Sequence, residues 1–362
     1  MDVEPFEIAV GDDVLADLQE RLRRTRWPSA APGAPWSQGT DRAYLQDLCA
    51  YWSDGFDWRE RETRLNTLEH FLADVGGVRV HFVHVRRGGT PLILTHGWPS
   101  AFTEYLPLVD RLDGFDLVIP SLPGYAFSAR PDTLTIRDTA KRWHALMRGL
   151  GYERYGAGGT DWGAGVTAYM ALDDPAPLLG IHLSNLDIWP AAEPETEAER
   201  AFAADTRRWD AVERGYSTQQ STRPQTLAYG LSDSPAGLAG WILEKWRAWS
   251  DSGGDLEAAF ARDFLLELVT LYWVTGTIGT SLRDYIDNYT AGTPKLSQRL
   301  TVRTGIANFH RSVADEGKLP REWAERIYPV ERFTDMPRGG HFAAAEQPDL
   351  LAGELRAFFL PG

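Results

Sequence analysis

The hydrophobic positions of residues 65–186 fall into short runs of the kind that form strands. Residues 70–75 and 78–85 alternate between apolar and polar side chains and flank a Gly-Gly pair, which is typical of a β-hairpin. Residues 91–97 and 116–124 are almost continuously apolar and end in Gly, as strands buried on both faces do. The pattern therefore predicts a sheet that begins with a hairpin and continues with buried strands.

Helical patterns separate the later strands. Strands that alternate with helices favour a parallel sheet joined by right-handed crossovers. The sequence therefore predicts an α/β fold with a mostly parallel central sheet flanked by helices. The further elements that we expect are a helix over residues 135–150, strands over residues 154–157, 180–185, 300–309 and 331–337, and a last helix over residues 346–359.

Two helical segments lie outside this alternation. The N-terminal one carries three leucines on one helical face, and either Asp12 or Asp13 can cap the start of that helix. The other is rich in Trp and lies between two strand-bearing regions, which predicts an inserted helical cap. The four expected parts are an N-terminal helical extension (1–64), a first core part (65–186), the cap (187–295) and a second core part (296–362).

The composition narrows the classes of function. Of the 362 residues 43% are hydrophobic and 24% are charged, so a sizeable core can form. The net charge of −14 argues against nucleic-acid binding, because the phosphate backbone is also negative. The single cysteine, Cys49, cannot form an intrachain disulfide, and no His or Cys spacing predicts a metal site. No stretch resembles a signal peptide or a membrane span, so we expect a soluble, cytoplasmic protein.

The strongest local signal lies at Asp161, in the run GGTDWGAG that begins at Gly158. This run follows a predicted strand and opens a predicted helix, as the G-x-nucleophile-x-G elbow of α/β-hydrolases does. The turn is so tight that the positions two before and two after the nucleophile, Gly159 and Gly163, need small residues. A carboxylate at this place attacks a strained or activated carbon and forms an ester. Asp161 therefore argues against protease or esterase activity.

Two further motifs complete a hydrolase pattern. The run His96-Gly97-Trp98-Pro99 follows a buried strand, where α/β-hydrolases supply one N–H group of the oxyanion hole. The backbone amides of Trp98 and Trp162 are the predicted donors. His341 lies in a Gly-rich turn between the last predicted strand and the last helix, which is the place of the general base in this chain order.

Together these motifs resemble the epoxide hydrolases of the microsomal type, over almost the whole chain. Further matches are the run Arg26-Trp27-Pro28, the run GYAFS that begins at Gly124, and two cap stretches, residues 217–246 and 271–285. The resemblance implies an α/β-hydrolase fold with a cap, no cofactor, and a small-molecule epoxide as substrate. The Trp-rich cap favours a bulky epoxide that is apolar or aromatic. Mammalian members carry an N-terminal membrane anchor for which this sequence has no counterpart, and homodimers are common.

The resemblance also implies two cap tyrosines, Tyr216 and Tyr285, that hydrogen-bond the epoxide oxygen. Ring opening places alkoxide charge on that oxygen, and a phenol can donate a proton there while it stays neutral at pH 7. Four cap tryptophans most simply pack the cap or line its pocket. These are Trp241, Trp246, Trp249 and Trp273.

The carboxylate that orients His341 is not fixed by the resemblance. The ungapped match falls on Ser312, and a longer loop brings Asp315 or Glu316 into place. Asp187, which follows an earlier strand, is a third candidate.

Two other functions stay open. A haloalkane dehalogenase uses the same kind of nucleophile, often followed by a Trp such as Trp162, but Trp98 stands where its halide-binding Asn is usual. A catalytically impaired, ligand-binding hydrolase-like protein follows if no carboxylate orients His341. A serine hydrolase is excluded, because Asp161 occupies the elbow.

Overall fold

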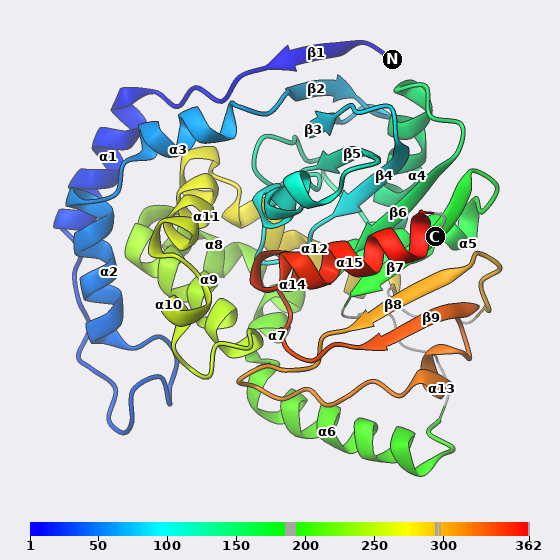
Figure 1. The fold of residues 1–362 in the computed structure, drawn as a ribbon. Helices are drawn as coiled ribbons and strands as arrows, with labels where there is room; N and C mark the ends of the chain where they lie inside the picture. Colours follow the sequence, from blue (N-terminus) through cyan, green and yellow to red (C-terminus); the bar gives the residue numbers. More distant parts are fainter. Residues whose placement is uncertain (185–192, 294–295, 297, 361–362) are drawn as a thin grey trace.

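The structure is a computed structural model, and it describes residues 1–184, 193–293, 296 and 298–360. A nine-stranded sheet forms the centre of this part of the chain. The strand order is β1-β2-β3-β5-β4-β6-β7-β8-β9, and all neighbours from β5 to β9 are parallel (Figure 1). The mostly parallel sheet is therefore confirmed. The strands are β1 Val3–Phe6, β2 His70–Asp74, β3 Arg79–Val85, β4 Thr90–Thr95, β5 Phe115–Pro120, β6 Tyr155–Gly159, β7 Leu178–Ser184, β8 Thr304–Asn308 and β9 Val330–Asp335.

The first three strands are antiparallel to their neighbours. The predicted hairpin joins β2 to β3 through Gly76 and Gly77, whose φ angles of 61° and 77° suit a tight turn between twisted strands. The edge strand β1 was not predicted, because four residues are too few to establish an alternation.

Helices cover both faces of the sheet. In Figure 1, α4 and α5 lie behind the sheet, and η1 and α15 lie in front of it. The helix α4 begins where expected, because Thr135 and Asp138 form a reciprocal capping box. The helices around the sheet are η1 Phe102–Arg111, α4 Ile136–Gly149, α5 Trp162–Asp173, α13 Arg321–Ala324, α14 Ala343–Glu346 and α15 Pro348–Phe359.

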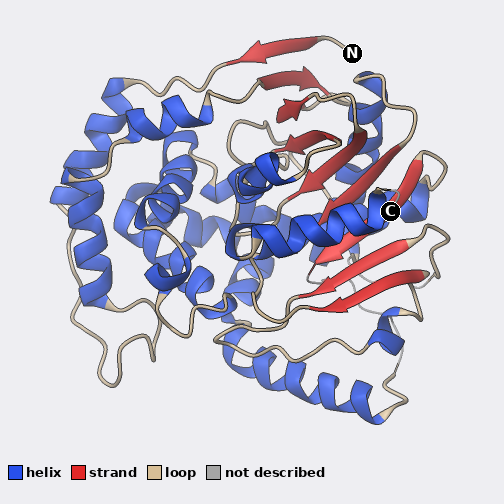
Figure 2. Ribbon diagram, in the orientation of Figure 1, coloured by secondary structure: helices blue, strands red, loops and turns tan. Residues whose placement is uncertain are grey.

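A group of helices lies between β7 and β8 in the sequence and next to the carboxyl ends of the parallel strands (Figures 1 and 2). We call α6 to α12 the cap. The predicted cap boundaries at residues 187 and 295 lie outside the described residues. The cap helices are α6 Glu197–Glu213, α7 Gly215–Thr222, α8 Pro224–Asp233, α9 Pro235–Trp249, α10 Leu256–Ala259, α11 Arg262–Thr275 and α12 Ile278–Ala291.

No single helix of the described residues is long and apolar enough to cross a membrane. The helices α11 and α12 together have the length and the apolar composition of a membrane span, but they are bent by 87° at their junction.

The N-terminal helices pack against this cap. They are α1 Asp12–Arg23, α2 Arg42–Asp54 and α3 Trp58–Leu65. The Trp52 indole N–H donates to Thr270 Oγ1 over 2.9 Å. Arg61 and Arg64 both reach the fully buried Glu267 Oε2, at 2.9 and 2.7 Å. The extension therefore fastens one side of the cap, a contact that the sequence did not predict.

Two details of the predicted helices are wrong. Gly11, and not an aspartate, is the N-cap of α1. Asp12 and Asp13 lie in the first turn of the helix, and Asp12 forms an ion pair with Arg59. The expected last helix, over residues 346–359, is α15 and begins two residues later, because Pro348 starts it and disfavours a helical conformation at Gln347; the short α14 precedes it.

We predict that replacing Arg61 and Arg64 together by Met lowers the free energy of unfolding by about 3 kcal/mol, because it leaves the buried Glu267 charge without a partner. Urea unfolding measures the change. The matched control replaces Arg23 and Arg148 by Met, since both form exposed ion pairs that contribute less than about 1 kcal/mol each. An equal loss in both double variants would contradict the role given to Glu267.

Candidate active site

The sharp turn between β6 and α5 places Asp161 at the carboxyl end of the sheet. Its φ of 54° and ψ of −130° are strained for a residue with a side chain, as expected at an elbow that presents a nucleophile. A Cβ on Gly159 would overlap the Gly163 carbonyl, and a Cβ on Gly163 would overlap the Thr95 carbonyl. The structure therefore gives the same steric reason for the two glycines as the sequence motif does.

The loop after β4 holds one oxygen of this carboxylate. The Trp98 backbone N–H donates to Asp161 Oδ1 over 2.7 Å, and a side chain on Gly97 would occupy the place of that carboxylate. Burial lowers the pKa of His96 to about 4, so this imidazole is neutral. Its Nε2 accepts from the Leu122 amide, which leaves the proton on Nδ1, facing the Gly97 carbonyl. His96 thus supports the loop.

His341 approaches the other carboxylate oxygen. Its Nε2 lies 3.3 Å from Asp161 Oδ2. The backbone N–H of His341 donates to the Trp249 carbonyl at the end of α9 over 2.8 Å. The elbow and the histidine, 180 positions apart in the sequence, are therefore brought into contact.

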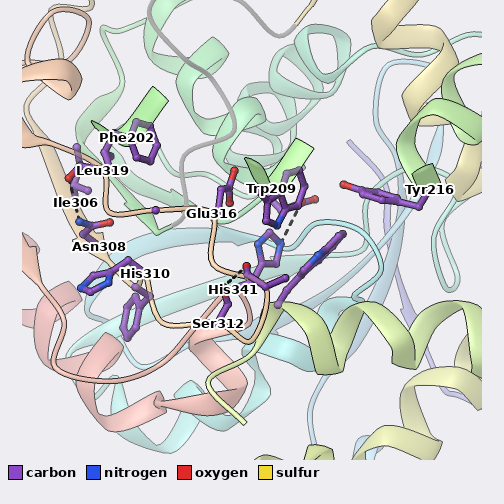
Figure 3. Close-up of a pocket in the computed structure, with 15 residues that line it drawn as sticks. Phe202, Trp209, Tyr216, Ile306, Asn308, His310, Ser312, Glu316, Leu319 and His341 are labelled. Atoms are coloured by element: carbon purple, nitrogen blue, oxygen red, sulfur yellow. Dashed lines mark hydrogen bonds and ion pairs between the residues drawn. The ribbon is translucent and has the colours of Figure 1, made fainter. Parts of the chain in front are cut away.

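The three carboxylates that the sequence offers to orient His341 differ in where the structure places them. Glu316 lines the same cavity as Asp161 and His341; burial raises its pKa, and the proximity of His341 opposes that rise. Asp315 is exposed, and its Oδ1 accepts the Gly317 amide over 2.9 Å. Asp187 lies outside the described residues. Of the two acids on this loop, the structure brings Glu316 to the site and not Asp315 (Figure 3).

The two cap tyrosines face the elbow from different helices. Tyr216 on α7 and Tyr285 on α12 have ring centroids 5.7 Å apart. Trp98 stacks on Tyr216 with an interplanar angle of 5°, and Trp162 meets Tyr285 edge-on at 5.0 Å. Both tyrosines therefore pack on the two residues whose backbone amides are the predicted oxyanion donors.

An ion-pair cluster fixes the helix that carries Tyr285. Arg130, from the loop after β5, is almost fully buried and pairs with Asp284 and Asp287 on α12. Asp287 Oδ2 also accepts the Leu134 amide over 3.0 Å. The core thus holds α12 by charge-assisted hydrogen bonds.

A cavity of about 80 Å³ is lined by Asp161, Glu316 and His341 (Figure 3), whereas Tyr285 is not among its lining residues. Its lining includes Trp209, Tyr216 and Trp249, and the Trp249 ring contacts the other two; sequence reasoning had named Tyr216 and Trp249. Further lining residues are Phe202, Ile306, Asn308, Phe309, His310, Ser312, Ala314, Gly317 and Leu319. Trp246 is fully buried against Phe342 and packs the cap, as the simpler interpretation expects.

Sequence reasoning missed Glu104. It lies in η1 and is 1% exposed. Burial raises its pKa to about 7, although the Ser100 hydroxyl and the proximity of His341 oppose that rise. Within the described ranges, no group of three or more His, Cys, Asp or Glu side chains could hold a metal ion.

The sheet topology, the elbow and the amide-bound carboxylate define an α/β-hydrolase. Residues 90–246 match the family described as "alpha/beta hydrolase fold", and residues 3–105 match "Epoxide hydrolase N terminus". A Stigmatella aurantiaca protein assigned as an epoxide hydrolase is 40% identical over 99% of this chain and 84% of its own length. Epoxide hydrolase 1 of Sus scrofa is 31% identical over 98% of this chain and 88% of its own.

The solved structure of the Aspergillus niger epoxide hydrolase superposes with a TM-score of 0.87 at 28% identity, over 99% of this chain and 96% of that one. The chain therefore belongs to the epoxide hydrolase family, as the resemblance implied.

We predict that the Glu104→Gln variant gains stability relative to the wild type as the pH rises from 5 to 8. A carboxyl whose pKa is raised from 4.5 to about 7 on folding stabilises the fold below pH 4.5, and that contribution is lost as the pH rises through 7. The difference is roughly 3 kcal/mol. Urea unfolding at several pH values measures it, with the exposed Glu7→Gln as control. A difference between Glu104→Gln and the wild type that does not change with pH would contradict it.

Proposed function

We propose that the protein hydrolyses an epoxide to a vicinal diol in two steps through an ester of Asp161. The observation that carries the proposal is the arrangement of its carboxylate: the Trp98 amide occupies Oδ1, and Oδ2 points to His341. Such an arrangement assigns one oxygen to an oxyanion hole and leaves the other free to attack.

In the first step, Oδ2 attacks a ring carbon of the epoxide and displaces the ring oxygen. The C–O bond breaks, and the ring oxygen takes a proton from the hydroxyl of Tyr216 or Tyr285. The contact of the two tyrosine rings with each other and with the tryptophans beside Asp161 supports this role. The product is a hydroxyalkyl ester of Asp161.

In the second step, His341 takes a proton from water, and the water oxygen attacks the ester carbonyl carbon. The negative charge develops on Oδ1, which the backbone amides of Trp98 and Trp162 stabilise. Trp162 begins α5, so its N–H has no acceptor within that helix. The bond between the carbonyl carbon and Oδ2 then breaks, and the diol leaves with a proton from His341. The second proton of the water, left on the regenerated Asp161 carboxyl, returns to the tyrosinate, so that all three groups are restored.

Glu316 is the carboxylate that orients His341 in this proposal. Its place in the cavity and the opposing effects on its pKa support it over the exposed Asp315. A carboxylate in this place stabilises the imidazolium that forms when water is deprotonated.

The substrate proposed is an apolar or aromatic epoxide. The cavity of about 80 Å³ is small beside the ~300 Å³ or more typical of drug-sized ligands, so we propose a compact substrate such as styrene oxide and not the bulky one that the sequence suggested. We also propose a cytoplasmic location, as the sequence predicts, and a homodimer, because dimers are common among soluble proteins.

We predict that wild-type protein forms diol from styrene oxide and that Asp161→Ala lowers the rate at least about 10⁴-fold, because it removes the nucleophile. Glu316→Gln slows turnover about 100-fold and accumulates the ester, seen as an added substrate mass on the intact protein. Asp315→Asn is the matched control on the neighbouring position and keeps wild-type turnover.

Three other outcomes would oppose parts of this proposal. Ester accumulation in Asp315→Asn, and not in Glu316→Gln, would assign the acid to Asp315. Halide release from a chloroalkane without turnover of any epoxide would favour the dehalogenase. An ester that forms and persists in the wild type would indicate the impaired, ligand-binding hydrolase-like protein.

A further inference from the structure

The turn that carries His341 is built into the end of cap helix α9. The His341 amide donates to the Trp249 carbonyl over 2.8 Å, and the Gly339 amide donates to Asp251 Oδ2 over 2.9 Å. A side chain on Gly340 would overlap the Trp249 carbonyl and the Asp251 amide. The backbone of the histidine turn therefore lies directly on the backbone that ends α9.

One carboxylate holds this junction together. Glu346 Oε2 accepts the Asp251 amide at 2.7 Å and the Gly340 amide at 3.0 Å. Glu346 Oε1 accepts the Phe342 amide at 3.0 Å. Two of these three donors flank His341 in the sequence, and the third belongs to the cap. Hydrogen bonds from amides to a carboxylate are among the stronger ones in proteins.

The loop that carries Glu316 joins the same junction. The Arg311 amide donates to the Gly339 carbonyl over 3.2 Å, and the Ala314 amide donates to the Ala248 carbonyl over 2.7 Å. The end of α9 is thus hydrogen-bonded both to the histidine turn and to the loop of Glu316, and these two segments are hydrogen-bonded to each other. A change at the junction is transmitted to the imidazole and to its proposed carboxylate partner together.

We propose that Glu346 is a positioning residue for the hydrolysis step: by holding the Gly340 and Phe342 amides against the end of α9, it sets where the His341 imidazole lies. The inference rests on the two-step function proposed above. Glu346 does not touch the substrate in this account, and the elbow at Asp161 has its own support from Thr95 and Trp98. Its loss therefore affects the step that uses His341 and spares the step that uses Asp161.

The test separates the two steps with Glu346→Gln. The glutamine side chain has nearly the shape of glutamate, but an NH₂ donor replaces one of the two acceptor oxygens. That donor then faces a backbone N–H group beside His341. In single-turnover experiments with excess enzyme and styrene oxide, we expect ester hydrolysis to slow about 10- to 100-fold. Ester formation stays within about threefold of the wild type, because Asp161 is unaffected.

The matched control is Glu354→Gln. Glu354 is also a buried carboxylate, on α15, but it pairs with Arg332 and Thr334 and lies outside the cavity lining. It should lose stability without a selective effect on ester hydrolysis. Equal slowing of both steps in Glu346→Gln, or no slowing of hydrolysis, overturns the proposal.

A second pair of variants tests the junction from the cap side. Asp251 is exposed, so its replacement is not expected to prevent folding. Asp251→Ala removes the acceptor of the Gly339 amide and should slow ester hydrolysis several-fold, whereas Asp251→Asn keeps an acceptor oxygen and should restore it. Identical hydrolysis rates in both variants contradict the coupling. No ester in the wild type, with no loss of turnover in Asp161→Ala, would instead refute the underlying two-step function.

Discussion

The rest of the site depends on the turn that carries Asp161. A residue with a side chain is held at a φ of 54°, and the glycines on either side leave no space for a Cβ. The strain is compensated by the packing of β4, β6 and α5 around the turn. As a result the carboxylate stands clear of the sheet with one oxygen against the Trp98 amide and the other 3.3 Å from His341 Nε2. The two oxygens have different surroundings before any substrate binds.

The cap and the N-terminal extension follow from what this turn requires. In the proposed mechanism the epoxide oxygen needs proton donors on the cap side of Asp161, and the two proposed donors, Tyr216 and Tyr285, lie together on cap helices α7 and α12. The extension packs on the far side of the cap through Glu267, and Arg130 holds α12 from the core. The histidine turn is bonded to the end of α9. The cap is thus supported from three directions.

Much of this could be predicted from the chain. The hairpin, the buried strands and the elbow have short-range signals, because glycine positions and unbroken apolar runs have local causes. The choice between Asp315 and Glu316 could not be made, since neighbouring residues on a loop point in different directions and only the fold decides which faces His341. Two other features could not be predicted: the contact of the extension with the cap, and the three-amide contact of Glu346. Both join residues far apart in the sequence, so no local sequence pattern indicates them.

The two-step ester is the central claim, and isotope labelling tests it most directly. A single turnover is run with excess enzyme and styrene oxide in ¹⁸O-labelled water. The masses of the diol and of the peptide that contains Asp161 are then measured by mass spectrometry. If water attacks the ester carbonyl carbon, the new diol oxygen is the old Oδ2, so the diol is unlabelled and Asp161 carries the label. A labelled diol with an unlabelled Asp161 would mean that water attacks the epoxide itself, and it would contradict the account.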